Sequence, residues 1–171
     1  MKFLPARLLV VALAAFAVAS SHAASLAKFK GAYEGTFTAS GTFDGYSGNA
    51  TGDAKVKIKP TQKNQAATIT ISGKDPDTGR DYNGTIKLNK DGTATTDAIV
   101  PGIDYEASGT WKLSANGKKI TVKLNATSPI GNATGTATLQ INGDVLKVKS
   151  SGDVSTVVGS GNGRFDFTGK K

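Results

Sequence analysis

The sequence predicts an all-β protein: a single antiparallel up-and-down meander of about 8–10 strands that closes into a barrel. First, nearly every segment after Lys30 alternates apolar and polar residues with a period of two, which is typical of half-buried strands. Second, Asp91-Gly92, Asn116-Gly117 and Asn142-Gly143 separate alternating segments, and such pairs accept the positive φ of tight hairpin turns. Third, no segment after residue 23 carries a helical period of 3.6 residues.

The alternation predicts ten strands, at residues 31–40, 50–60, 66–73, 81–89, 92–100, 103–114, 118–127, 132–142, 144–150 and 163–169. Residues 93–100 fit least well because neither parity is consistently apolar, and the Ser-, Gly- and Val-rich residues 151–162 remain unassigned. Strands that are apolar on one side favour closure, which leaves no unpaired edge. The architecture expected is therefore a lipocalin-like barrel, with a β-sandwich as the alternative. No family motif accompanies this likeness.

The N-terminus has the three regions of a secretory signal peptide. Lys2 and Arg7 supply positive charge, residues 8–18 are eleven consecutive apolar residues, and Ser21-His22-Ala23 offers small residues at a cleavage site. The apolar run is too short to span a bilayer as a mature helix. We expect a signal peptide over residues 1–23, a single β-barrel domain over residues 24–171, and export to the periplasm or the extracellular space.

Removal of the signal peptide lowers the net charge from +8 to +6 and removes the single histidine, His22, from a chain that has no cysteine. The remaining domain is basic. It cannot form a Ser-His-Asp triad, a histidine-liganded metal centre, a thiolate site or a disulfide. No pair of carboxylates is expected to face a common cleft. The sequence therefore predicts a protein that is not an enzyme, with no catalytic residues, no metal and no cofactor.

The two ends of the predicted barrel differ. Short turns join the strands at one end, whereas the connections at residues 41–49, 74–80 and 151–162 make the other end rich in long loops. Inward positions near the long-loop end are mostly Gly and Ala, as in the segment 131–137, whereas the tight-turn end carries large apolar residues. This division predicts a cup with a packed floor and a widened mouth, the position in which barrels hold small ligands.

Five side chains are candidates for the mouth of the cup. They are Phe43, Tyr46, Arg80, Tyr82 and Tyr105. They would bind a small apolar ligand at the long-loop end. The alternative is that Gly and Ala only ease strand bending, so that the barrel is filled and the protein is a structural or surface-interaction protein.

A stripe of lysines, Lys55, Lys57 and Lys59, is expected on the outside of one strand, where it could contact a polyanionic surface. No aromatic residues alternate with these lysines, so specific nucleic-acid binding is not expected. A small outer-membrane barrel is a further alternative, with the apolar faces turned outward. Each strand offers only two or three large apolar residues and aromatic girdles are lacking, so membrane insertion is not expected.

Overall fold

The computed structural model describes residues 25–74, 76, 79–97 and 106–171. The predicted signal peptide over residues 1–23 and the candidate residue Tyr105 lie outside these ranges.

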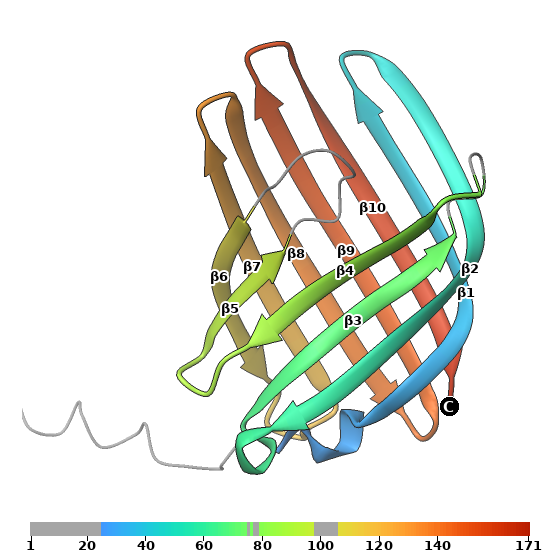
Figure 1. The fold of residues 1–171 in the computed structure, drawn as a ribbon, viewed down its shortest axis with the longest axis vertical. Helices are drawn as coiled ribbons and strands as arrows, with labels where there is room; N and C mark the ends of the chain where they lie inside the picture. The colour runs from blue at the N-terminus through green and yellow to red at the C-terminus, as the bar shows by residue number, and fades with distance from the viewer. Residues whose placement is uncertain (1–24, 75, 77–78, 98–105) are drawn as a thin grey trace, which may run out of the picture.

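Within the described residues, ten antiparallel strands form one closed up-and-down barrel, in which each strand pairs with its neighbours in sequence and β1 pairs with β10 (Figure 1). The predicted barrel is confirmed. The β-sandwich alternative is wrong, because pairing of β1 with both β2 and β10 leaves one continuous sheet. The strands are β1 (Gly31–Phe43), β2 (Tyr46–Thr61), β3 (Ala66–Lys74), β4 (Asp81–Leu88), β5 (Thr93–Asp97), β6 (Glu106–Leu113), β7 (Lys119–Ser128), β8 (Gly131–Asn142), β9 (Val145–Thr156) and β10 (Gly159–Lys170).

Two of the three connections predicted to be long loops are strands. Residues 41–49 belong to the β1–β2 hairpin, which turns at Asp44-Gly45, and residues 151–162 belong to the β9–β10 hairpin, which turns at Val157-Val158. The loop prediction at these two places is wrong. Gly, Ser and Thr fill both parities there, so no contrast in hydropathy marks the strands. Residues 41–43 of β1 and 151–156 of β9 pair with neighbouring strands on both sides, whereas within the described structure residues 46–49 of β2 pair with β1 alone.

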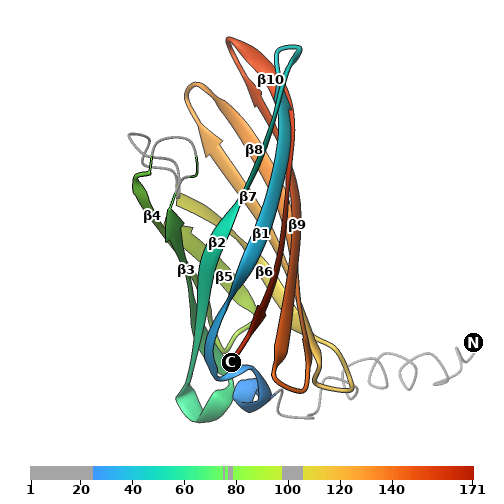
Figure 2. The ribbon, with the colours of Figure 1, turned by 90° about the vertical axis from the view of Figure 1, so that its right-hand side faces the viewer.

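The barrel has a tall wall and a short wall. Strands β1, β2 and β7–β10 have 10–16 residues, whereas β3–β6 have only 5–9. Of the strand predicted at 92–100, residues 93–97 form β5, and residues 98–100 lie outside the described residues. Figure 2 shows the hairpins of the tall wall rising above the ends of β3 and β4. One side of the barrel mouth is therefore much higher than the other.

Large apolar side chains fill the lower half of the barrel, as predicted. Fully or almost fully buried side chains include Val56, Ile58, Ile69, Leu88, Ile120, Val122, Leu139, Leu146 and Phe167. Trp111 joins this cluster, and its indole Nε1–H donates to the backbone oxygen of Asn89 at 2.7 Å. The pairing satisfies the polar group of the indole while its rings stay buried. The lower half is therefore a packed floor.

A short 3₁₀ helix, η1 (Leu26–Phe29), closes the barrel from below, and the strand pattern did not predict it. Leu26 and Phe29 are completely buried, and the Tyr33 hydroxyl donates to the backbone oxygen of Phe29 at 3.0 Å. Four residues are too few to show a helical period, so this plug has no signature in the pattern. Its two apolar side chains complete the floor.

Replacement of Phe29 by alanine should lower the free energy of unfolding by about 3–5 kcal/mol, because it leaves a cavity in the plug. Chemical denaturation of the purified domain measures this loss. The matched control is Tyr46→Ala, at a side chain that projects into solvent, which should change the free energy of unfolding by no more than about 0.5 kcal/mol. Equal losses in the two variants would show that η1 does not contribute to the core.

Candidate ligand-binding cavity

The barrel contains an open cavity of about 990 Å³ above the packed floor. Apolar side chains from the floor form its base, among them Val56, Ile69, Ile86, Leu139 and Val148. Its walls rise along both the short strands and the tall hairpins. The volume lies at the upper end of the range in which proteins bind small organic molecules.

A row of glycines lies on the inner face of the tall wall. Gly41, Gly163, Gly152 and Gly135 lie opposite one another in register across β1, β10, β9 and β8. Three of the four border the cavity. Because a strand points alternate side chains to opposite faces, this inward row presents backbone instead of side chains. The wall therefore occupies little of the interior.

Steric crowding explains only some of these glycines. A Cβ on Gly152 would lie 2.7 Å from the backbone oxygen of Thr134, so a larger residue would disturb the wall. A Cβ on Gly135 or Gly163 would meet its nearest atom only at 3.7 or 3.8 Å, which is ordinary contact, and neither residue has a positive φ. Neither close packing nor backbone conformation requires glycine at these two positions. Their effect is to keep the cavity open.

Three aromatic rings form one side of the cavity. Phe37 and Phe165 stack with their centroids 5.4 Å apart and their planes 21° apart, and Phe37 meets Tyr82 edge-on at 6.2 Å. Phe37 and Phe165 were absent from the predicted site. They share the inward parity of Tyr33 and Phe167, so parity alone does not distinguish these two cavity-lining rings from neighbours that fill the core.

The hydroxyl of Tyr82 is buried and, among the described residues, has no hydrogen-bond partner. Desolvation raises the pKa of this phenol above its ordinary value. A buried polar atom without a partner is unusual in a folded protein, because it loses its hydrogen bonds to water. It is the one polar side-chain atom of this kind within the described structure.

The structure brings together only two of the predicted mouth residues. Arg80 and Tyr82 border the cavity. Phe43 and Tyr46 lie instead at the tip of the β1–β2 hairpin and are not among the residues that border it. Tyr105 lies outside the described residues. The separation arises because the segment predicted as a loop is a hairpin that carries both rings away from the floor.

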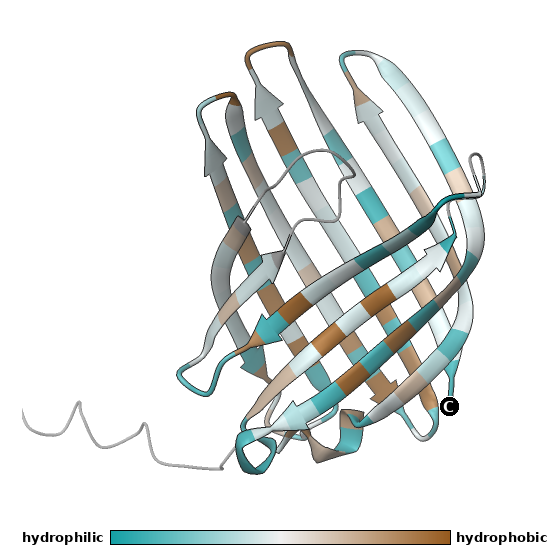
Figure 3. Ribbon diagram, viewed as in Figure 1, coloured by the Kyte–Doolittle hydropathy of each residue, from teal (hydrophilic) through white to brown (hydrophobic). Residues whose placement is uncertain are grey.

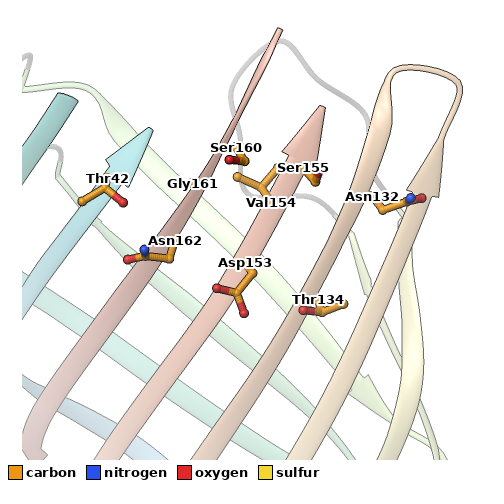
Figure 4. Close-up of a pocket in the computed structure, with 9 residues that line it drawn as sticks. All are labelled: Thr42, Asn132, Thr134, Asp153, Val154, Ser155, Ser160, Gly161 and Asn162. Atoms are coloured by element: carbon orange, nitrogen blue, oxygen red, sulfur yellow. The ribbon is translucent and has the colours of Figure 1, made fainter. Parts of the chain in front are cut away.

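A second, smaller hollow of about 490 Å³ lies on the outer face of the tall wall (Figure 4). A row of outward polar residues, Thr42, Asn162, Asp153 and Thr134, crosses β1, β10, β9 and β8 in register. All four are exposed to solvent. The hollow contains no buried polar group that would fix a ligand, so we interpret it as solvated surface.

The lysine stripe also faces solvent. Lys55, Lys57 and Lys59 are all exposed on β2. The Lys55 Nζ pairs with the Glu34 Oε1 at 2.6 Å across the β1–β2 ladder. This lysine holds the pKa of the Glu34 carboxyl below its usual range through a hydrogen bond and charge attraction. One of the three positive charges is thus locally balanced, which weakens the stripe as a site for a polyanion.

The raised pKa of Tyr82 predicts a loss of stability in alkali. The folded chain retains the phenol proton where the unfolded chain releases it, at about pH 10. The contribution of Tyr82 to stability is complete below that pH and disappears as the pH rises through the folded pKa. Tyr82→Phe should therefore lose less stability than the wild type between pH 9 and about 11.5, measured by urea unfolding. Identical slopes would contradict the burial of this hydroxyl.

Comparisons with known proteins support the fold. The chain is similar to the protein in "Crystal Structure of Rv2717c from M. tuberculosis", with a TM-score of 0.55 and 15% identity over 85% of this chain and 94% of that chain. At this identity the likeness shows the barrel fold alone. No family model and no curated protein matches the sequence. Among the described residues, none of the helices has the length and apolar character needed to cross a membrane, and His, Cys, Asp and Glu form no cluster of three that could hold a metal.

Proposed function

We propose that this protein is an exported binding protein that holds one small, mainly apolar ligand in the cavity of its barrel. The observation that carries the proposal is the open, apolar cavity of about 990 Å³, together with glycines at positions 135 and 163 that neither crowding nor backbone conformation requires. A barrel with a purely structural role would gain stability from larger side chains at these two positions.

The lining indicates the class of ligand. The charged residues that border the cavity, Arg80, Asp81 and Arg164, are exposed to solvent, and no charged side chain is buried within the described structure. The buried part of the cavity therefore offers no charge that would compensate for the desolvation of a charged ligand. The rings of Phe37, Phe165 and Tyr82 and the bare backbone of the glycine row provide flat surfaces. These features suit an uncharged molecule with a ring system.

Tyr82 supplies the polar contact expected in such a site. Its hydroxyl has no partner among the described residues, so a ligand acceptor within reach would satisfy it. Small-molecule sites commonly combine a mainly apolar lining with a few polar groups that fix orientation. A ligand with one carbonyl or hydroxyl oxygen at its edge fits this arrangement best.

Filling the cavity should abolish binding without unfolding the protein. The purified domain, residues 24–171, is titrated with pyrene, an uncharged flat probe whose emission reports an apolar environment. The wild type should bind one pyrene per chain, and the double variant Gly135→Leu/Gly163→Leu should bind it at least tenfold more weakly, because both leucines enter the cavity.

The matched control carries the same two leucines on the outer face, as Thr38→Leu/Thr51→Leu, at an exposed cross-strand pair. This control should bind pyrene like the wild type, and both double variants should keep the wild-type unfolding midpoint within a few degrees. A wild type that does not bind pyrene, or an equal loss in the control, would overturn the cavity proposal.

The role of Tyr82 is tested separately with two related probes. Tyr82→Phe should weaken binding of 1-pyrenecarbaldehyde about fivefold, as expected for the loss of one hydrogen bond. Binding of pyrene itself, which has no acceptor, should stay unchanged. An equal effect on both probes would show that the hydroxyl affects packing and not recognition.

A further inference from the structure

All large apolar side chains that are exposed within the described structure lie at one end of the barrel, at the tips of three hairpins. They are Phe43 (40% exposed), Tyr46 (82%), Ile130 (50%), Val157 (79%) and Val158 (75%). We call these five residues the apolar rim. Figure 1 places the three hairpin tips together at the top of the tall wall, and Figure 3 shows apolar colour at the β7–β8 and β9–β10 tips.

The three tips form one connected structure. The Val157 N–H donates to the backbone oxygen of Ile130 at 3.0 Å and so joins the β9–β10 tip to the β7–β8 tip. The Asp44 N–H donates to the backbone oxygen of Ser160 at 2.9 Å and joins the β1–β2 tip to β10. These bonds therefore hold the backbones of the three tips in fixed positions relative to one another.

Two of the tips are built in the same way, although their sequences differ. They are Ser128-Pro129-Ile130-Gly131 and Thr156-Val157-Val158-Gly159. In each, the first hydroxyl accepts a hydrogen bond from the N–H two residues later, at 3.3 Å, and donates to the backbone oxygen of the glycine, at 3.2 or 3.0 Å. This arrangement places apolar residues where turns ordinarily carry Gly, Asn or Asp.

Three turns at the opposite end follow the ordinary rule, and the fourth, η2 (Gln62–Asn64), is polar. They carry Asp91-Gly92, Asn116-Gly117 and Asn142-Gly143, with Asp or Asn side chains that bond to the backbone at the first two of them. Exposed apolar residues in the turns are therefore not a general property of this barrel. Exposed apolar area is concentrated at the end of the barrel that holds the mouth of the cavity.

The chemistry of the rim suits contact with lipid. The Ser128 and Thr156 hydroxyls and the bond from Val157 to Ile130 satisfy backbone groups of these two turns from within the protein. Transfer from water to lipid costs little free energy for polar groups that already have a hydrogen-bond partner within the protein. Asp44 is the single charged residue among the turn residues 44–45, 129–130 and 157–158. The rim thus lacks the basic cluster that selects anionic lipid.

We propose that the apolar rim inserts into the facing leaflet of a zwitterionic lipid bilayer, which has no net charge, and docks the barrel with its mouth toward the membrane. Insertion stops at the tips, because the strands behind them turn Thr, Ser and Asn outward, at positions such as Thr42, Ser155 and Asn162. This docking stands independently of the proposed ligand binding, since its observations concern only the outer tips.

The test is flotation of the domain with vesicles of dioleoylphosphatidylcholine. The wild type should float with the vesicles, with little change between about 0.05 and 0.5 M salt, because charge contributes little. The variant Ile130→Ser/Val157→Ser/Val158→Ser should partition at least tenfold more weakly. The matched control, Lys90→Ser/Lys118→Ser/Asp144→Ser, alters exposed residues at the opposite end and should float like the wild type.

The serine variant should keep its unfolding midpoint and its affinity for pyrene, which separates the rim from the cavity. A wild type that stays with the soluble fraction at millimolar lipid overturns the proposal, as does equal flotation of the serine variant. A wild type that self-associates through the rim and ignores the vesicles also overturns it, in favour of a second copy as the occupant. A wild type that floats with the vesicles but does not bind pyrene would overturn only the cavity proposal.

Discussion

The interior volume of a closed barrel is set by its strands, and the size of the inward side chains decides whether that volume is filled. Here the inward residues change from large to small along the strands of the tall wall. On β8 they run from Ile141 and Leu139 in the floor to Ala137, Gly135 and Ala133 above it. The cavity depends on register, because a slip by one residue would turn outward residues such as Thr136 and Ser151 into the barrel.

The packed floor allows the upper half to remain open. Large side chains and the η1 plug are buried below, so much of the core lies beneath the open half of the barrel. The tall wall is held mainly by backbone ladders, since each of its strands pairs on both sides. Its small inward residues therefore leave the cavity unfilled instead of contributing to the core. The same ladders carry the hairpins beyond the cavity and position the tips.

The sequence predicted the parts of the structure in which hydropathy and geometry agree. The alternation of lysines with Val56 and Ile58 located β2, and Asn142-Gly143 located a turn. The strands within residues 151–162 were not predicted, because Gly and Ser give no contrast in hydropathy between the two faces. The turn was not predicted either, because a valine pair is a poor turn signal unless the hydrogen bonds of the Thr156 hydroxyl are known. In the site, parity identified Tyr82. The stacking of Phe37 on Phe165 joins strands at opposite ends of the chain, so no local pattern reveals it.

The pairing of β1 with β10 has a consequence for how the chain reaches this state. Phe37 lies opposite Phe167, 130 positions later, so the sheet stays open until its last strand has been synthesised. Long-range pairing of this kind makes folding slow. Until it forms, β1 and the growing end of the meander both expose unpaired backbone that another chain could join. A chain that lacks β10 would keep these two edges permanently, and we expect such a fragment to aggregate even though most of its core residues are present.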